Sequence, residues 1–421
     1  MPMMKDSGIE WIGKIPQDWE IYKIKHFFNV LRGRVISVLD LEDDGKYPVY
    51  SSQTENNGCF GYLNTYDYEG EAITWTTDGA KAGTVFYRNG KYNCTNVCGI
   101  LQKKKNIAFE TDIKFLTHAI SMVAEQNKRA DINGFKIMSN EMARISFAIP
   151  NIEIQKKIST YLDSKCAEID ALASDIRAEI DTLEEYKRSV VFDKVLHGLS
   201  NNTIMVETDS DVWDKMPQGW KLVDIKYLFE IVKRIAGKEG FDVLSVTQKG
   251  LRVKDITSGD GQLADNYSGY QFVYPTDYVM NHMDLLTGWV DLSSMFGVTS
   301  PDYRVFRLRD KRNNSLDYYK YVMQCCYMNR IFYSLGQGVS NLGRWRLQTS
   351  SFNNFKVPVP PLEEQVAIAD FLNKTISETD AIIAEKQIQM ATLDEYKKSL
   401  IYEYVTGKKE VPHEFNAKAV C

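Results

Sequence analysis

The sequence predicts a mixed α/β protein in which two α/β domains are joined by two long, antiparallel, coiled-coil-like helices. Short motifs recur in the same order in a pseudo-two-fold internal repeat, two segments carry apolar residues at heptad spacing, and the segments between alternate strand-like and helix-like patterns. The recurring motifs are IPQDWEIYKIKHFF (15–28) and MPQGWKLVDIKYLF (216–229), IPNIEIQKKISTYLD (149–163) and VPPLEEQVAIADFLN (359–373), and LEEYKRSV (183–190) and LDEYKKSL (393–400).

The repeat divides the chain into two half-copies. The first motif pair is 201 residues apart, and the two later pairs are 210 residues apart. The variable segments, from Phe28 to Ile149 and from Phe229 to Val359, share little visible sequence. Similar frames around dissimilar inserts indicate one scaffold that presents two different surfaces.

The two patterned segments are predicted to be amphipathic helices of about 45 residues, or about 65 Å. Neither contains Pro or Gly after its start, and Gly198 and Gly407 lie where a left-handed C-cap is expected. Neither helix can hide its apolar stripe alone, so we expect the stripes to pack on each other; the alternative is that each packs on its own domain. The stripe positions are Leu162, Ile169, Ile176, Leu183 and Val190, with Cys166, Ala173, Ile180 and Tyr186 beside them, and Leu372, Ile376, Ile383, Met390, Leu393, Tyr396 and Leu400.

The variable segments have the patterns of small α/β domains. AITWTTDGAKAGTVFYRNGKYNC, FDVLSVTQKGLRV and YRVFRLRD read as strands and hairpins, whereas DIKFLTHAISMVA and LDYYKYVMQCCYM read as short helices. The predicted boundaries are 1–150 for the first domain, 151–200 for the central helix, 201–360 for the second domain, and 361–421 for the C-terminal helix and tail.

The composition is that of an ordinary soluble globular protein. Of the 421 residues, 44% are apolar and 25% charged, and no apolar run is long enough for a membrane span. The N-terminus lacks the pattern of a secretory signal, and seven cysteines do not make a disulfide scaffold. Cys94 and Cys98 have C-x3-C spacing without a second ligand pair, so we expect reduced thiols and no metal. The expected compartment is the cytoplasm.

Motifs for catalysis are absent from the sequence. It contains no Walker A loop, no Asn/Asp-Pro-Pro-aromatic tetrapeptide, no Gly-rich methyl-donor loop after a strand and no Gly-x-Ser-x-Gly elbow. The Glu-Tyr-Lys triplets at Glu185 and Glu395 lie within the predicted helices, where a solvated face explains them better than a nuclease pattern. We therefore expect the chain to catalyse nothing alone.

Two basic stretches remain for recognition. No acidic residue occurs from Gly79 to Phe109 or from Tyr318 to Leu362, although the net charge of the whole chain is −5. Lys and Arg mixed with aromatic, amide and hydroxyl side chains suit phosphate and base-edge contacts; the alternative at any one position is a solvated loop. GQGVSNLGRWRLQTSS (336–351) has a Gly-rich turn suited to entering a groove. The DNA-binding candidates are Lys81, Arg88, Lys91, Lys103, Lys104, Lys105, Arg330, Arg344, Trp345, Arg346 and Lys356.

This order of parts resembles the DNA-specificity subunits of type I restriction-modification enzymes. The resemblance is carried by the twin IPQDW and MPQGW motifs, the twin IPNIEIQ and VPPLEEQ steps, and the twin helices ending LEEYKRSV and LDEYKKSL. It covers nearly the whole chain. The first step reads Pro-Asn-Ile where the second reads Pro-Pro-Leu, which is a mild departure.

The resemblance implies a non-catalytic subunit of a cytoplasmic bacterial or archaeal complex. Each domain would recognise one half of a bipartite, asymmetric site in double-stranded DNA, and the helices would set the gap. Two modification subunits, which bind S-adenosylmethionine and methylate adenine, would dock on the helices. Two restriction subunits, with motor and nuclease functions that use ATP and Mg, would complete the complex. No cofactor would bind to this chain itself.

Two other classes of function stay open at the level of sequence. A bivalent coiled-coil adaptor that binds only proteins would explain the helices but not the paired basic stretches. A self-sufficient methyltransferase or nuclease would need motifs that the sequence lacks.

Overall fold

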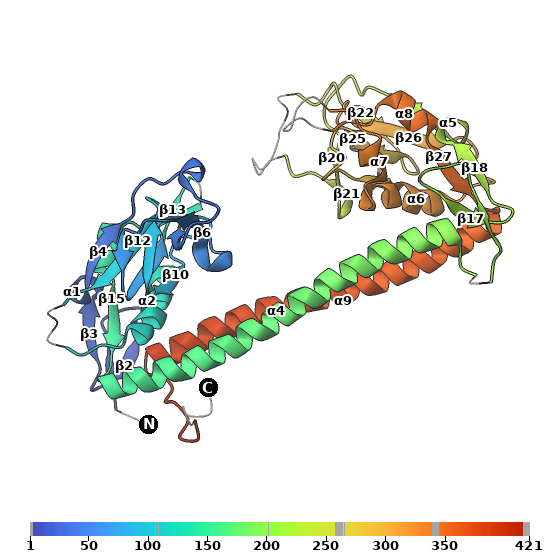
Figure 1. Cartoon of the computed structure of the whole chain (residues 1–421). Helices are drawn as coiled ribbons and strands as arrows, with labels where there is room; N and C mark the ends of the chain where they lie inside the picture. The colour runs from blue at the N-terminus through green and yellow to red at the C-terminus, as the bar shows by residue number, and fades with distance from the viewer. Residues whose placement is uncertain are drawn as a thin grey trace. The chain divides into compact units, whose positions relative to one another are not determined.

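The chain forms two compact units, each built from parts of both half-copies. The computed structural model describes residues 3–415 apart from 106, 108, 133, 201, 257–263, 265 and 339–344. The first unit comprises residues 1–176 and 387–421, and the second comprises residues 177–386. Each therefore contains one α/β domain, one part of the first long helix and one part of the second (Figure 1).

Two four-stranded sheets form most of the first domain. One is antiparallel, with the order β10-β8-β12-β4. The other has the order β6-β5-β11-β7 and contains the parallel pair β11 and β5. The smaller sheets are β1-β2, β15-β3 and β13-β14-β9. The strands are β1 (Met4–Asp6), β2 (Lys14–Pro16), β3 (Glu20–Lys23), β4 (Phe28–Arg32), β5 (Tyr47–Tyr50), β6 (Cys59–Leu63), β7 (Tyr68–Glu69), β8 (Ala72–Thr76), β9 (Asp78–Gly79), β10 (Val85–Arg88), β11 (Lys91–Cys94), β12 (Cys98–Lys103), β13 (Arg129–Asp131), β14 (Gly134–Lys136) and β15 (Ser146–Ile149).

Helix α2 (Ile113–Asn127) packs on strands β8, β10 and β15 of the first unit. Its apolar face joins a core that includes Trp75 and Phe115, both fully buried, and this core continues onto Leu162 and Leu400 of the long helices. The remaining helices of this domain are short, namely α1 (Ile24–Phe27), α3 (Ser139–Arg144) and the 3-10 turns η1 (Val38–Asp40) and η2 (Asn56–Gly58).

The second domain is built around one four-stranded antiparallel sheet with the order β19-β26-β23-β24. The other strands form four two-stranded sheets, β16-β17, β18-β27, β20-β21 and β22-β25. Its strands are β16 (Met205–Glu207), β17 (Lys215–Pro217), β18 (Lys221–Asp224), β19 (Phe229–Val232), β20 (Leu244–Thr247), β21 (Gly250–Val253), β22 (Gln271–Val273), β23 (Tyr278–Met280), β24 (Val290–Leu292), β25 (Gly297–Thr299), β26 (Arg304–Leu308) and β27 (Lys356–Val359).

Helix α6 (Leu316–Met328) takes the place in the second unit that α2 takes in the first. Tyr318 and Phe306 are fully buried in its core, which continues onto Val191 and Leu372 of the long helices. The shorter helices are α5 (Ile225–Leu228), α7 (Ile331–Ser334) and α8 (Thr349–Asn354).

The structure reproduces the repeat that the motifs predict. Strand β3 pairs with β15 in the first unit, as β18 pairs with β27 in the second. Helices α1 and α5 follow β3 and β18 directly, and α3 and α8 precede β15 and β27. The strands between these shared elements differ in number, length and order. The repeated motifs thus build a common frame, and the variable segments build different domains on it.

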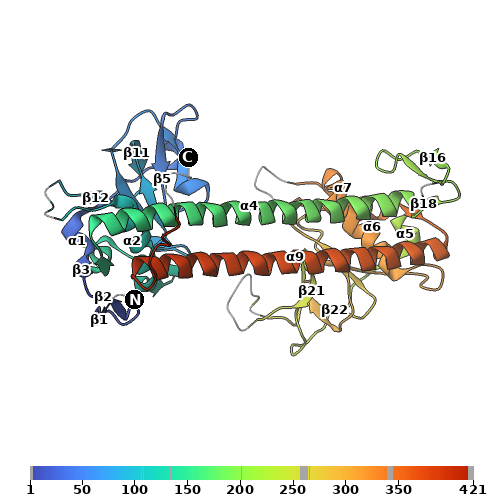
Figure 2. The same cartoon turned by 90° about the horizontal axis from the view of Figure 1, so that it is seen from below.

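The long helices are α4 (Ile152–His197) and α9 (Leu362–Val405). In the first unit the carboxylate of Asp170 accepts a hydrogen bond from the ammonium group of Lys397 at 2.6 Å, and the ring of Tyr161 packs against the ring of Tyr404. In the second unit Lys187 bonds Asp380 at 2.5 Å, and Glu179 pairs with Lys386. Within each unit the partner number falls as the residue number rises, so the helices run antiparallel (Figures 1 and 2). The predicted fold class is confirmed.

The apolar stripe is buried along both helices. Less than one tenth of the residue is exposed at Leu162, Ile169, Ile176, Val190, Leu372, Ile383 and Leu400, and Leu183, Ile376, Met390 and Leu393 are partly buried. The cores at the helix ends include domain residues as well, so the stripe contacts both the other helix and the domains.

Tyr186 and Tyr396 differ from the expectation. The heptad pattern predicts Tyr186 beside the stripe of the first helix and Tyr396 in the stripe of the second, but they are 48% and 55% exposed. The second line of the heptad pattern, which runs through Cys166, reaches Lys187 rather than Tyr186, which explains the difference.

The predicted boundaries at 150/151 and 360/361 fall just before α4 and α9. In the part of the chain that the structure describes, no helix is both long and apolar enough to cross a membrane.

Candidate nucleic-acid interface

A buried glutamine joins each domain to its long helix. Gln155 of α4 is fully buried; its side-chain oxygen accepts from the backbone N–H of Asp112 at 2.9 Å, and its amide donates to the carbonyl of Pro150 at 2.8 Å. Asp112 is the N-cap of α2. The glutamine therefore satisfies a backbone donor at the start of the domain helix while fixing the start of the long helix.

The second unit repeats this joint. Gln365 of α9 accepts from the backbone N–H of Ser315 at 2.9 Å and donates to the carbonyl of Pro360 at 2.9 Å. Ser315 is the N-cap of α6. Both glutamines stand in the repeated steps IPNIEIQ and VPPLEEQ, and their identity in the two copies is the signal in the sequence that could have pointed to this role.

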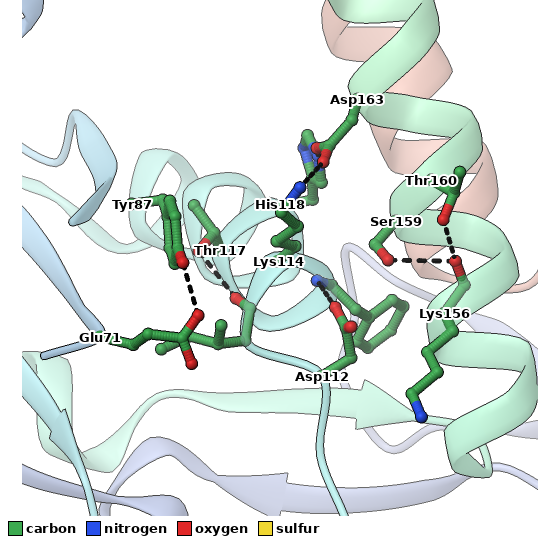
Figure 3. Close-up of polar contacts among 12 residues, drawn as sticks. Glu71, Tyr87, Asp112, Lys114, Thr117, His118, Lys156, Ser159, Thr160 and Asp163 are labelled. Carbon is green, nitrogen blue, oxygen red and sulfur yellow. Dashed lines mark hydrogen bonds and ion pairs between the residues drawn. The ribbon is translucent and has the colours of Figure 1, made fainter. Parts of the chain in front are cut away.

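About two turns further along each long helix, a second polar contact joins the same elements. Asp163 of α4 accepts from Lys114 of α2 at 2.9 Å and lies 2.9 Å from Nε2 of His118 (Figure 3). Burial alone would raise the pKa of Asp163. The hydrogen bonds and charges of His118 and Lys114 together outweigh this effect, so the pKa is lowered overall. The equivalent residue of α9 is Asn373, which accepts from Lys320 at 3.2 Å and from Tyr321 at 2.8 Å.

The tryptophans of the first motif pack on the glycines that end the long helices. In the second unit, Gly198 has a φ of +74°, and a Cβ added there would lie 3.2 Å from the ring of Trp220. In the first unit, Gly407 has a φ of +69°, and a Cβ would lie 2.5 Å from Pro16 and 3.1 Å from Trp19. The predicted left-handed caps are thus present, and each is covered by the opening motif of the domain in its unit.

Arg88 is the exception among the cations of the first basic stretch. It is only 2% exposed; Nε donates to Thr74 at 2.9 Å, and the guanidinium lies 3.5 Å above the ring of Tyr50. Burial lowers the pKa of Arg88. The guanidinium is packed inside the domain, so the predicted role as a surface phosphate contact does not fit its position in this structure.

The lysines of this stretch lie at the surface. Lys81 and Lys105 are exposed. Lys91 is exposed, and Tyr66 and Glu69 raise its pKa. The ammonium groups of the other two lysines donate to backbone carbonyls, Lys103 to Thr111 at 2.9 Å and Lys104 to Lys25 at 2.8 Å. These hydrogen bonds fix the two ammonium groups near the end of β12.

Trp345, the aromatic candidate of the second basic stretch, packs against its own domain. Nε1 of Trp345 donates to the carbonyl of Tyr333 at 2.6 Å, and the two rings are stacked with centroids 5.5 Å apart. Added Cβ atoms at Gly336 and Gly338 would clash with the Trp345 ring, which explains the glycines before it. Trp345 is therefore a packing residue here, and Arg344 lies outside the described residues.

Arg346 is exposed beside this ring. Burial, together with the charges of Arg304 and Arg346, lowers the pKa of His282 to about 3, so the imidazole is neutral at physiological pH. Arg330 is exposed in a left-handed conformation with a φ of +55° at the start of α7. The ammonium group of Lys356 pairs with Asp209 at 3.1 Å, and Nε1 of Trp213 donates to the backbone carbonyl of Lys356. Arg330 and Arg346 are thus the described candidates of this stretch whose charge faces solvent most directly.

Within the described ranges, no group of three or more His, Cys, Asp or Glu side chains has the arrangement of a metal site. Cys94 and Cys98 are buried, reduced thiols.

The chain belongs to the family described as the type I restriction modification DNA specificity domain. The sequence pattern of this family matches residues 16–182 and again residues 217–391. The two matches coincide with the two half-copies, and they place the chain among the specificity subunits, which are the non-catalytic components of these systems.

Curated relatives are similar over about one half-copy. A Mycoplasma pneumoniae protein named for the N-terminus of a type I specificity subunit is 44% identical over 144 residues, which is 34% of this chain and 75% of that protein. The type I restriction enzyme MpnII specificity subunit of the same organism is 34% identical over 189 residues, which is 44% of this chain and 56% of that subunit.

Structural similarity extends over nearly the whole chain. A chain from a study of complex assembly and conformational transition in the type I restriction-modification system has a TM-score of 0.62 at 13% identity, covering 94% of this chain and 99% of that chain. At this identity the likeness concerns the fold.

Proposed function

We propose that this specificity subunit binds double-stranded DNA, with each domain reading one half of a bipartite, asymmetric site. The observation that carries the proposal is the repeated joint. The same buried glutamine attaches two dissimilar domains to two equivalent helices. A chain built as an internal repeat can meet duplex DNA as a dimer does, and unlike domains give unlike half-sites.

The exposed cations support phosphate contacts. Lys81, Lys105, Arg330 and Arg346 lie at the surface of segments that contain no acidic residue. Lys103 and Lys104 add two ammonium groups at the end of β12. Cations of this kind bind DNA of any sequence by releasing counterions, whereas base contacts supply the specificity.

The long helices also carry a repeated surface that packing does not explain. Leu172 and Ile382, which are equivalent, are 49% and 45% exposed, and the equivalent Tyr186 and Tyr396 are about half exposed. By contrast, a buried stripe position differs between copies, with Ile169 in one and Thr379 in the other. Retention of exposed apolar residues at equivalent positions, while a buried position such as this one diverges, favours a shared partner.

Each unit contains one such surface. Leu172 and Tyr396 belong to the first unit, and Ile382 and Tyr186 belong to the second. Glu185 and Glu395 are exposed next to the tyrosines, so the complementary partner is apolar and basic. We infer that two copies of the same methyltransferase subunit dock here. S-adenosylmethionine would bind to those subunits, and ATP and Mg would bind to two restriction subunits.

DNA binding is tested with the assembled complex on duplex DNA at several salt concentrations. Replacing Lys103, Lys104 and Lys105 by Ala should weaken binding to every sequence and flatten the salt dependence, because fewer counterions are released. Lys374→Ala, an exposed cation of α9, is the matched control. A complex that assembles but shows no salt-dependent retention on DNA would favour the protein-only adaptor.

Docking is tested by counting methyltransferase copies with native mass spectrometry. Tyr186→Ala and Tyr396→Ala should each lower occupancy from two copies toward one, and the double variant toward none. Ile388→Ala is the matched control, since Ile388 is 67% exposed on α9 but its counterpart is Ala178. Full occupancy in the double variant would place the docking surface elsewhere.

A further inference from the structure

The second basic loop has a counterpart in the first unit that its sequence does not reveal. The backbone N–H of Leu347 donates to the carbonyl of His282 at 3.0 Å, and that of Ile137 donates to the carbonyl of Thr77 at 2.9 Å. Leu347 and Ile137 are 210 residues apart, the same interval that separates the repeated long helices. The segment that precedes α8 is therefore bonded to the second domain at the place where the segment that precedes α3 is bonded to the first.

Antiparallel pairing brings the two ends of each segment together. In the second unit Gln337 pairs with Arg346, and in the first unit Arg129 pairs with Lys136 through strands β13 and β14. The equivalence extends to residue type, because Phe135 and Lys136 correspond to Trp345 and Arg346. Hairpin β13–β14 thus ends in the first unit at the place equivalent to that of Trp345 and Arg346 in the second, which belong to the stretch predicted to enter a groove.

The tip of hairpin β13–β14 carries an apolar side chain with no packing role. Asp131 pairs with Gly134, so the chain turns between them, and Ile132 is 98% exposed. No other large hydrophobic residue in the described ranges is as exposed. Tight turns favour Gly, Asn and Asp, and a β-branched residue gains nothing there. The isoleucine contributes neither to the turn nor to the core.

The sides of the hairpin suit a polyanion. Arg129 pairs with Glu141 at 2.8 Å, Lys136 with Asp131 at 3.2 Å, and Lys128 with Glu125 at 2.8 Å. Surface ion pairs of this kind contribute little to stability, so a phosphate can replace the carboxylate as the partner of each cation. A two-stranded ribbon also fits the major groove of B-DNA, in which the thymine methyl group is the apolar feature of the base edges.

We propose that hairpin β13–β14 enters the major groove of one half-site and that Ile132 contacts the base edges there. The inference rests on the proposed function and adds to it a specificity-determining residue in the first domain. Ile132 contacts an apolar feature of the bases, such as a thymine methyl group. Arg129 and Lys136, which belong to the two strands of the hairpin, bind the flanking phosphates.

The test is selection of duplexes from a randomised library by the assembled complex, comparing the wild-type chain with Ile132→Ala. The variant should relax the preference at one position of one half-site by about three- to fivefold, the value of one lost methyl contact. The other half-site should be unchanged. Ile132→Val should restore most of the preference. Leu39→Ala, which removes another almost fully exposed side chain of the same unit, should leave the motif unchanged.

The outcomes separate this inference from the proposed function. If the wild-type complex selects a bipartite motif and Ile132→Ala selects the same motif with the same preferences, the role of Ile132 is wrong and the proposed function stands. A uniform loss across all sequences would also overturn the base contact, because it would indicate a phosphate-positioning role. If the wild-type complex selects no motif, the proposed function itself fails.

Discussion

The two joints between domain and long helix have the same geometry but different chemistry. Both begin with a buried glutamine that caps the domain helix, at Gln155 and at Gln365. Beyond it, the first unit uses the carboxylate of Asp163 with His118 and Lys114, whereas the second uses the amide of Asn373 with Lys320 and Tyr321. The position of the contact is retained while the charge changes. The long helix therefore contributes a carboxylate that acid can titrate in the first joint and an uncharged amide in the second.

The largest effect is expected from breaking the helix pair to which both joints attach. Ile176→Asp places a charge at a position that is 7% exposed on α4, and a buried, unpaired charge costs several kcal/mol. Thermal unfolding should shift strongly downward. Leu172→Asp is the matched control one turn earlier, where the side chain is 49% exposed and the change should be small. Equal stability of the two variants would contradict the packed stripe.

Removal of the shared glutamine should weaken both joints alike. Gln155→Leu or Gln365→Leu leaves the N-cap N–H of α2 or α6 without its acceptor, at a cost of about 1–3 kcal/mol. Hydrogen exchange measured by mass spectrometry should show faster exchange at the start of α2 in the first variant and of α6 in the second. Faster exchange in both helices from either single change would show that the joints are not independent.

The helix caps should respond unequally. Alanine at either left-handed glycine is strained by about 1 kcal/mol. At Gly407 the new methyl group would also meet Pro16 at 2.5 Å, whereas at Gly198 the nearest atom lies 3.2 Å away on Trp220. Chemical denaturation should therefore show that Gly407→Ala is the more destabilising substitution. The reverse order would mean that the opening motif yields more readily in the first unit.

The smallest effect is a difference in acid sensitivity. The folded state lowers the pKa of Asp163, so the carboxylate stabilises the first unit above the usual pKa of Asp, about 3.9. That contribution is lost as the pH falls through the lowered pKa. Asp163→Asn imitates Asn373 and should remove this component from the unfolding curve between about pH 4 and lower values, with little change in the second unit. An unaltered acid response would exclude the Asp163 contact as its source.

Much of the frame could be predicted because it is written twice. Heptad spacing at positions such as Leu162 and Leu372 defines both helices, and the glycines at 198 and 407 define their ends. The joints themselves were not predicted, since a glutamine that reaches a backbone N–H some forty residues away leaves no local pattern. Equivalence between the copies was the only signal for it.

The interface was less accessible to sequence reasoning. Basic composition identified the surface lysines but also selected Arg88 and Trp345, which pack within their domains. Whether a cation faces solvent depends on strand register and on aromatic neighbours such as Tyr50, which composition does not record. Hairpin β13–β14 escaped notice because its charges are balanced along the sequence, and only its place in the fold marks it.

The central claim is that the frame is common and the domains are independent readers of DNA. The most direct measurement is the methylated motif, in cells, of a chimera in which the segment between Phe229 and Val359 is replaced by that of another specificity subunit. The repeated motifs on either side stay intact, so the joints at Gln155 and Gln365 are retained. We predict that one half-site changes while the other half-site and the gap stay as they were. A change in both half-sites, or in the gap without any change to α4 or α9, would contradict the account.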